Sequence, residues 1–228
     1  MANALSKLGV TRLAHFTPAL NLPHILADGC IRSSKDLASQ SPEYFSPTDR
    51  NRFDSHPDKV CCSFEYPNPY YLAQAAGKPD FTNYRDWVCL LLDITLVLRP
   101  GVLFCPYNAA TGRGAYAHEG GDALLACFRD RVGTWERGSR HHPKVATDLQ
   151  AEVLVPGPIE LSYLRGIVVP SAEAAQEEWG RLRLLGVSSD GYPWVVAPTF
   201  FRKLALSSRL RFGGVIRETK WQPPQDGT

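Results

Sequence analysis

The sequence lacks the residue patterns of several common metal and nucleotide sites. Its six cysteines include no CxxC pair, and the side chains of neighbouring Cys61 and Cys62 would point to opposite faces of a strand. The segment Gly112-Arg113-Gly114 has neither the GxGxxG spacing nor that of a Walker loop. The adjacent pair His141-His142 is unsuited to holding one ion. We therefore expect no metal site, no Rossmann cofactor site and no P-loop.

Long apolar runs are missing as well. The longest, residues 87–98, is interrupted by Asp93 and is too short to cross a bilayer. The N-terminus has no basic segment followed by an apolar one, as a secretory signal would. These absences predict a cytoplasmic protein without a membrane partner. Most of the cysteines lie in apolar runs and none forms a CxxC pair, so we expect them to be reduced thiols of the core.

The composition allows one compact catalytic unit. With 228 residues, 44% of them hydrophobic, and no low-complexity stretch, the chain can bury a substantial core, so we expect a single domain over residues 1–228. A net charge of +2 does not by itself indicate a nucleic-acid-binding protein. Many basic residues nevertheless gather in two groups, which are either ordinary solvated surface or a track for phosphates. They are Arg129, Arg131, Arg137, Arg140 and Lys144, and Arg202, Lys203, Arg209, Arg211 and Arg217.

The order of apolar patterns and turn residues predicts a mixed α+β fold with a split, largely antiparallel sheet. After a short strand that ends at residues 15–17, a helix should end at Gly29 in a left-handed cap. A loop should follow over residues 33–58, and residues 60–76 should form a strand and a helix. Further strands are expected at 87–98, 102–106, 164–169 and, as the last, 194–197, with helices at 121–131 and 171–185.

Glu152 is the strongest catalytic candidate. It lies near the start of a predicted buried strand, in the run Ala151-Glu152-Val153-Leu154-Val155. An ionised carboxylate is rarely left inside a core without partners, so an acid in such a strand lines a site, ends an ion pair or faces solvent on a half-exposed strand. The first of these interpretations makes Glu152 a catalytic residue.

Three segments in this order resemble the DarT family of DNA ADP-ribosyltransferase toxins. They are the strand with His15 and the helix closed by Gly29, the segment 60–72, and the segment 150–155 with Glu152. The resemblance covers roughly residues 10–170. It implies an ADP-ribosyltransferase fold with an NAD cleft, NAD as co-substrate without a metal, and single-stranded DNA as acceptor. The family has guanine-modifying and thymine-modifying branches, and the segments 63–68 and 108–112 favour guanine.

The resemblance also implies roles for particular residues. Glu152 would stabilise the developing positive charge and act as general base, and Arg52, or else Arg50, would hold phosphate or charge on the base. His15 would hydrogen-bond the NAD ribose while the backbone of Phe16 and Thr17 meets the nicotinamide amide. Further NAD contacts would come from Asn21, Gly29 and Tyr71, and contacts to DNA from Tyr66, Asn108, Arg113, Tyr116 and Arg140. A macrodomain antitoxin that reverses the modification is the implied partner.

Other interpretations of the same residues stay open. His15 suits a core position with a backbone partner, Arg50 and Arg52 suit a solvated loop, and the tyrosines suit the core. Residues 108–114 suit a plain turn. The chain as a whole could be an ADP-ribosyltransferase for RNA or protein, or a non-catalytic nucleic-acid-binding module. Hydrolysis of NAD separates the enzymes from the module.

Overall fold

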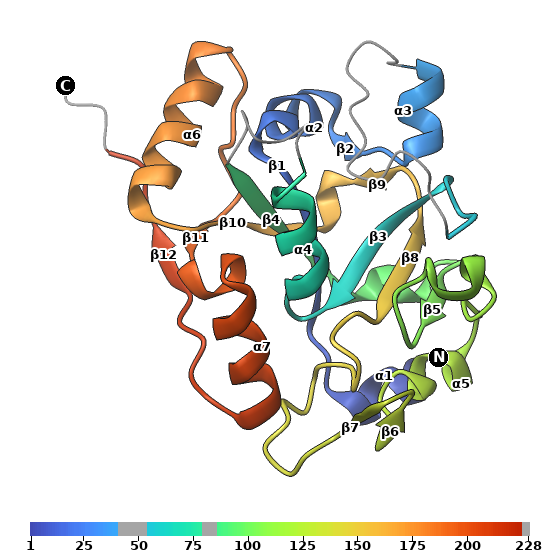
Figure 1. The fold of residues 1–228 in the computed structure, drawn as a ribbon. Coiled ribbons are helices and arrows are strands. Elements are labelled where there is room, and N and C mark those ends of the chain that lie inside the picture. Colours follow the sequence, from blue (N-terminus) through green and yellow to red (C-terminus); the bar gives the residue numbers. More distant parts are fainter. Residues whose placement is uncertain (41–53, 79–85, 225–228) are drawn as a thin grey trace.

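The fold is built on one large sheet in a computed structural model that describes residues 1–40, 54–78 and 86–224 (Figure 1). In the described residues this sheet has eight strands in the order β12-β11-β10-β4-β1-β3-β8-β5, and all neighbours are antiparallel except β10 and β11. The strands are β1 (Arg12–Pro18), β3 (Lys59–Phe64), β4 (Trp87–Asp93), β5 (Leu103–Cys105), β8 (Glu152–Pro156), β10 (Leu164–Val169), β11 (Trp194–Val196) and β12 (Thr219–Trp221). Two small sheets pair β2 (Cys30–Ile31) with β9 (Ile159–Glu160), and β6 (Arg131–Val132) with β7 (Trp135–Glu136).

Helices cover both faces of the large sheet. Residues of α1, α2, α5 and α6 share one apolar cluster with the strands, while α4, α7 and the short helix η7 pack on the opposite face, which is the front in Figure 1. The helices are α1 (Ala2–Leu8), α2 (Leu22–Asp28), α3 (Ser34–Gln40), α4 (Pro69–Ala76), α5 (Gly121–Ala126), α6 (Ala172–Leu184) and α7 (Lys203–Phe212). Short 3₁₀ helices are η1 (Ala19–Asn21), η4 (Ile94–Leu98), η5 (Thr111–Gly114), η6 (Leu161–Tyr163) and η7 (Pro198–Phe201).

The sheet is split between β1 and β3. These strands pair only at Leu13 with Phe64 and Ala14 with Ser63, whereas β1 pairs with β4 along its whole length. After Ala14, the backbone of β1 is therefore no longer paired with β3. The predicted α+β fold with a split, largely antiparallel sheet is confirmed.

Several predicted elements have the right place and type, including the left-handed cap at Gly29, where φ is 69°, and the helix that Ser171 caps. Others are wrong. The strand at 87–98 ends at Asp93, because the side chain of Asp93 accepts a hydrogen bond from Thr95 N and begins η4. The helix at 121–131 ends at Ala126, the loop at 33–58 begins with α3, and α7 and β12 follow the strand expected to be last.

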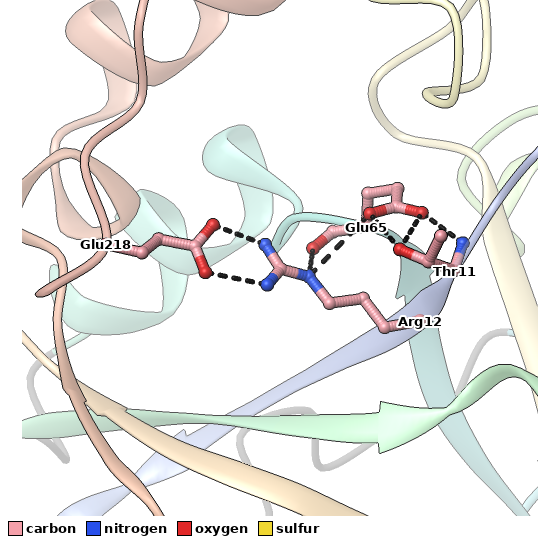
Figure 2. A network of polar contacts seen from close by, with 4 residues as sticks. All are labelled: Thr11, Arg12, Glu65 and Glu218. Atoms are coloured by element: carbon pink, nitrogen blue, oxygen red, sulfur yellow. Dashed lines mark hydrogen bonds and ion pairs between the residues drawn. The ribbon is translucent and has the colours of Figure 1, made fainter. Parts of the chain in front are cut away.

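A polar network ties the C-terminal strand to the start of β1 (Figure 2). The guanidinium of Arg12 binds both carboxylate oxygens of Glu218 at 2.5 and 2.7 Å, and its Nε donates to the backbone carbonyl of Glu65 at 2.9 Å. The Glu65 carboxylate is buried and accepts hydrogen bonds from the backbone and hydroxyl of Thr11. We call these four residues the Arg12 network.

The backbone of Glu65 has a φ of 63°, a left-handed conformation that costs free energy for a residue with a side chain. It turns the chain directly after β3 and brings the Glu65 carboxylate back to Thr11. The network therefore fixes the end of β3 against the start of β1, beside the two residue pairs that join these strands.

Arg12→Met should destabilise the protein by about 2–4 kcal/mol, because it leaves the buried Glu65 carboxylate without its charged neighbour. Arg165→Met is the matched control, since its ion pair with Asp93 is largely exposed and should contribute less than about 1 kcal/mol. Urea unfolding followed by circular dichroism measures both. Equal losses in the two variants would contradict a structural role for the network.

Candidate active site

Glu152 is the first residue of β8 and is buried, with 8% of its surface exposed. It lies opposite Cys105 of the edge strand β5, and the rest of β8 is apolar and buried. Since side chains alternate along a strand, Glu152 shares a face with Leu154, and Leu154 lies opposite Cys61 of β3. The solvent-facing interpretation of Glu152 is therefore wrong.

Asn108 holds the carboxylate of Glu152. Its side-chain nitrogen donates to Glu152 Oε1 at 3.1 Å, and its side-chain oxygen accepts from the backbone N–H of Ala110 at 3.0 Å. Because the amide oxygen is held by Ala110, the amide nitrogen is the atom that faces Glu152. The sequence interpretation placed Asn108 on nucleic acid, whereas the structure places its amide on the candidate catalytic acid.

The loop that carries Asn108 is pressed against the chain just before β3. Gly114 has a φ of 84°, and a Cβ added to it would lie 2.2 Å from the backbone oxygen of Asp54. Only glycine fits this approach. The turn expected over residues 108–114 is thus present as η5 and its flanks, and it has a definite place beside the Glu152 end of the sheet.

His15 reaches across the split in the sheet. Its Nδ1 lies 2.8 Å from the backbone carbonyl of Cys61, past the point where β1 and β3 stop pairing. A carbonyl only accepts, so Nδ1 must carry a proton, and Nε2 of the neutral ring is left as an acceptor. Burial lowers the pKa of His15, which favours this neutral form. The ring thus has the backbone partner expected of a core histidine, and its second nitrogen is an acceptor.

The other residues predicted to contact NAD follow His15 closely. Phe16 is half-buried, and its ring centroid lies 5.8 Å from those of Tyr71 and Trp87. The hydroxyl of Thr17, which is buried, accepts a hydrogen bond from the Asn21 side chain at 2.8 Å. These contacts place the end of β1, the start of α2 and one face of α4 in one region, and Gly29 closes α2 at its far end.

The residues predicted to contact DNA are scattered. The ring of Tyr66 packs edge-on against His142 and Phe200, and the Arg12 guanidinium lies 5.2 Å from its centroid. Arg113 and Tyr116 are exposed in the loop around η5, and Arg140 is exposed near the C-terminal end of α7. Tyr66 therefore belongs to the surroundings of the Arg12 network, while the other three remain open to solvent.

Some predictions fall outside the structural description. Arg50 and Arg52 lie in the segment 41–53, beyond the described residues. In the described parts of the chain, no group of three or more His, Cys, Asp or Glu side chains is placed to hold a metal ion. No helix there is both long and apolar enough to span a membrane.

Two polar residues that the sequence interpretation did not select have a prominent place. Arg12 and Glu65 lie next to the β1–β3 junction, and Glu65 is 4% exposed. A buried acid directly after a predicted strand was a signal of the same kind as that of Glu152. Its partners are distant in sequence, which is why the segment around it did not identify them.

The chain was compared with protein families and with known proteins. A family model described as ssDNA thymidine ADP-ribosyltransferase, DarT, matches residues 14–192, more than three quarters of the chain. Among curated protein sequences, none matches.

Solved structures with a similar fold include Thermus sp. 2.9 DarT in complex with ADP-ribosylated ssDNA, with 15% identity and a TM-score of 0.59 over 85% of this chain and 97% of that one. The same Thermus protein in complex with NAD+ has 16% identity and a TM-score of 0.57, over 84% and 97% of the two chains. Thermosipho africanus DarTG in complex with ADP-ribose has 19% identity and a TM-score of 0.57, over 83% of this chain but only 50% of that chain. At these identities the likeness establishes the fold.

His15 should titrate below the ordinary histidine pKa of about 6.5 and should carry its proton on Nδ1 when neutral. Long-range proton–nitrogen NMR spectra of the histidine rings, recorded against pH and assigned with His15→Gln, measure both properties. A neutral ring protonated on Nε2, or a pKa above the ordinary value, would contradict the contact with Cys61.

Proposed function

Because the chain belongs to the DarT family, we propose that it transfers ADP-ribose from NAD to a base in single-stranded DNA. The family makes the chain an NAD-using ADP-ribosyltransferase. The observation that supports Glu152 as its catalytic acid is local: a buried carboxylate begins β8 and is oriented by Asn108, within the matched residues. Residues 1–228 act as one catalytic domain in this proposal.

Glu152 has two tasks in the transfer. The bond between C1′ of the ribose and the nicotinamide nitrogen breaks, and positive charge develops on the sugar. A carboxylate held in place beforehand stabilises that charge without reorganising. As the bond from C1′ to the base forms, the base loses a proton, which Glu152 accepts as general base. Arg52, or else Arg50, supplies positive charge to phosphate or to the base.

His15 positions the co-substrate. Its Nε2 accepts a hydrogen bond from a ribose hydroxyl, because Nδ1 is already engaged with Cys61. The backbone of Phe16 and Thr17 then faces the nicotinamide amide, and Tyr71 lies beside Phe16 to cover it. Asn21 acts through its hydrogen bond to Thr17, and Gly29, in the left-handed conformation that ends α2, is a further NAD contact.

The acceptor is an unpaired base. A base in a duplex is stacked and paired, so its edge is out of reach unless a few kcal/mol are spent on extruding it. Guanine is our favoured base, and thymine, which the family's description names, is the alternative. Asn108 is committed to Glu152, so Arg113 and Tyr116, exposed on the same loop, are the better contacts to DNA.

The antitoxin partner in this proposal is a macrodomain that removes the modification. One relative of known structure, Thermosipho africanus DarTG, is twice as long as the part that this chain matches. Transfer to RNA or protein, or nucleic-acid binding without catalysis, are the outcomes that would replace the proposal.

Glu152→Gln should lower transfer at least about 100-fold while the fold is retained, because the amide cannot accept a proton or supply charge. Asn108→Ala should lower it less, by about tenfold, through a misplaced carboxylate. Mass spectrometry of a single-stranded oligonucleotide incubated with NAD measures the transfer, and Glu177→Gln on the exposed face of α6 is the matched control. Transfer by Glu152→Gln near the wild-type level would remove Glu152 from the mechanism.

A set of oligonucleotides that each contain one type of central base should show the mass of one added ADP-ribose on guanine, and little on the same sequence as duplex. Modification of thymine alone would keep the family reaction and correct the base. Modification of RNA or protein but not of DNA would overturn the acceptor, and a chain that neither transfers nor hydrolyses NAD would be a binding module.

A further inference from the structure

A cavity of about 770 Å³ lies near the opposite edge of the large sheet from Glu152. Its walls come from β11, η7, the end of α7 and the segment that leads into β12, and include Val196, Thr199, Arg209, Val215, Arg217 and Thr219. All of these residues follow residue 192, where the match to the family ends. The cavity has the size of sites that hold small ligands or parts of larger ones.

The charge on the cavity wall is positive. Arg209 is fixed there, because one of its terminal nitrogens donates to Thr199 Oγ1 at 3.1 Å and to the Val215 carbonyl at 2.7 Å. Arg217 is exposed, and no carboxylate of the described residues pairs with it. The neighbouring acid, Glu218, is occupied by Arg12 in the Arg12 network (Figure 2).

The two basic groups of the sequence meet beside this cavity. His142 N donates to the Leu210 carbonyl at 2.8 Å, and the guanidinium of Arg211 lies 3.7 Å from the centre of the Trp135 ring. A Cβ on Gly213, which lines the cavity, would be 3.7 Å from the Cβ of Arg140. The exposed Arg140 therefore lies beside Gly213, next to the cavity.

The part of the cavity wall that η7 and α7 supply lies on the same face of the sheet as Glu152, whereas the side chains of Val196 and Thr219 alternate to the other face. The strand pairings place Glu152, Cys61, Ser63 and Ala14 on one face, and Ala14 shares an apolar cluster with Phe200 of η7. Five strand spacings separate β8 from β11, which is about 24 Å at 4.8 Å each. About seven nucleotides span that distance at the 3.4 Å spacing of a stacked strand, and fewer if the strand is extended.

We propose that the cavity binds phosphate groups of the single-stranded DNA at a distance from the modified base. The guanidinium groups of Arg209 and Arg217 suit phosphate oxygens, and Arg140 extends the contact along the strand. The exposed side chain of Val215 gives an apolar surface on which a sugar or base can pack. This inference rests on the proposed function. It adds a second contact to DNA that does not depend on base sequence, and because of this contact the enzyme should prefer longer strands.

The test compares DNA affinity for a short and a long strand, of about 4 and about 16 nucleotides, by fluorescence anisotropy without NAD. Arg217→Gln should weaken binding of the long strand about 3- to 10-fold and reduce the slope of log K against log salt by about 0.7, with little change for the short strand. Val215→Glu, which brings a negative charge to the wall, should weaken it further. Lys7→Gln removes an equal charge from α1 and should change neither the affinity for the long strand nor the salt slope. NAD hydrolysis should be unchanged in all three variants.

Three results would overturn the proposal: an unchanged affinity of Arg217→Gln for the long strand, an equal loss on both strands, or an unchanged salt slope. Calorimetric titration of the wild type with inorganic phosphate and with AMP tests whether the cavity binds a free phosphate or nucleotide in place of the phosphates of DNA. Binding of AMP that needs Arg217, with unaltered DNA affinity, would assign the cavity to a free nucleotide and overturn the DNA assignment. A wild type that binds long DNA through Arg217 yet transfers nothing would support the cavity and remove the proposed reaction.

Discussion

The guanidinium of Arg12 joins three parts of the chain that are distant in sequence. It binds the carboxylate of Glu218 before β12 and the backbone of Glu65 after β3, and it lies next to the short pairing of β1 with β3. A buried carboxylate such as that of Glu65 is stable only with such partners. Because β1 and β3 pair at two positions only, this polar contact supports the junction from which the split begins, and the split is where His15 lies.

The acid Glu152 could be selected from sequence, because a single acid in an apolar strand is a local pattern, and the structure shows that it is buried. His15 was selected through the resemblance, and the roles of both residues in catalysis stay predictions. The support of Glu152 could not be predicted, since Asn108 is 44 residues away and lies in a segment that has the composition of a plain turn. Tyr66 is suited by type to stacking on a base, and its neighbours could not be predicted either: a distant arginine and two other rings pack around it.

For the fold, the apolar periodicity predicted most strands and helices up to β11, while α7 and β12 were missed. In α7 the buried apolar residues are Leu206 and Leu210, and most of the other residues of the helix are basic or polar. Such a sequence indicates surface charge before it indicates a helix. β12 has just one half-buried residue, Trp221, and its place in the sheet comes from pairing with β11, which no local pattern encodes.

Three of the four residues of the Arg12 network lie outside the region that matches the family model. The family match begins at residue 14 and ends at residue 192. Glu65 lies inside this range, whereas Thr11, Arg12 and Glu218, the three residues drawn with it in Figure 2, all lie outside. A chain trimmed to residues 14–192 would keep the buried Glu65 carboxylate and lose its partners Thr11 and Arg12, together with Glu218, which binds Arg12. Arg12 and Glu218 therefore link the two outer segments to each other, and Arg12 links both to Glu65 within the family region.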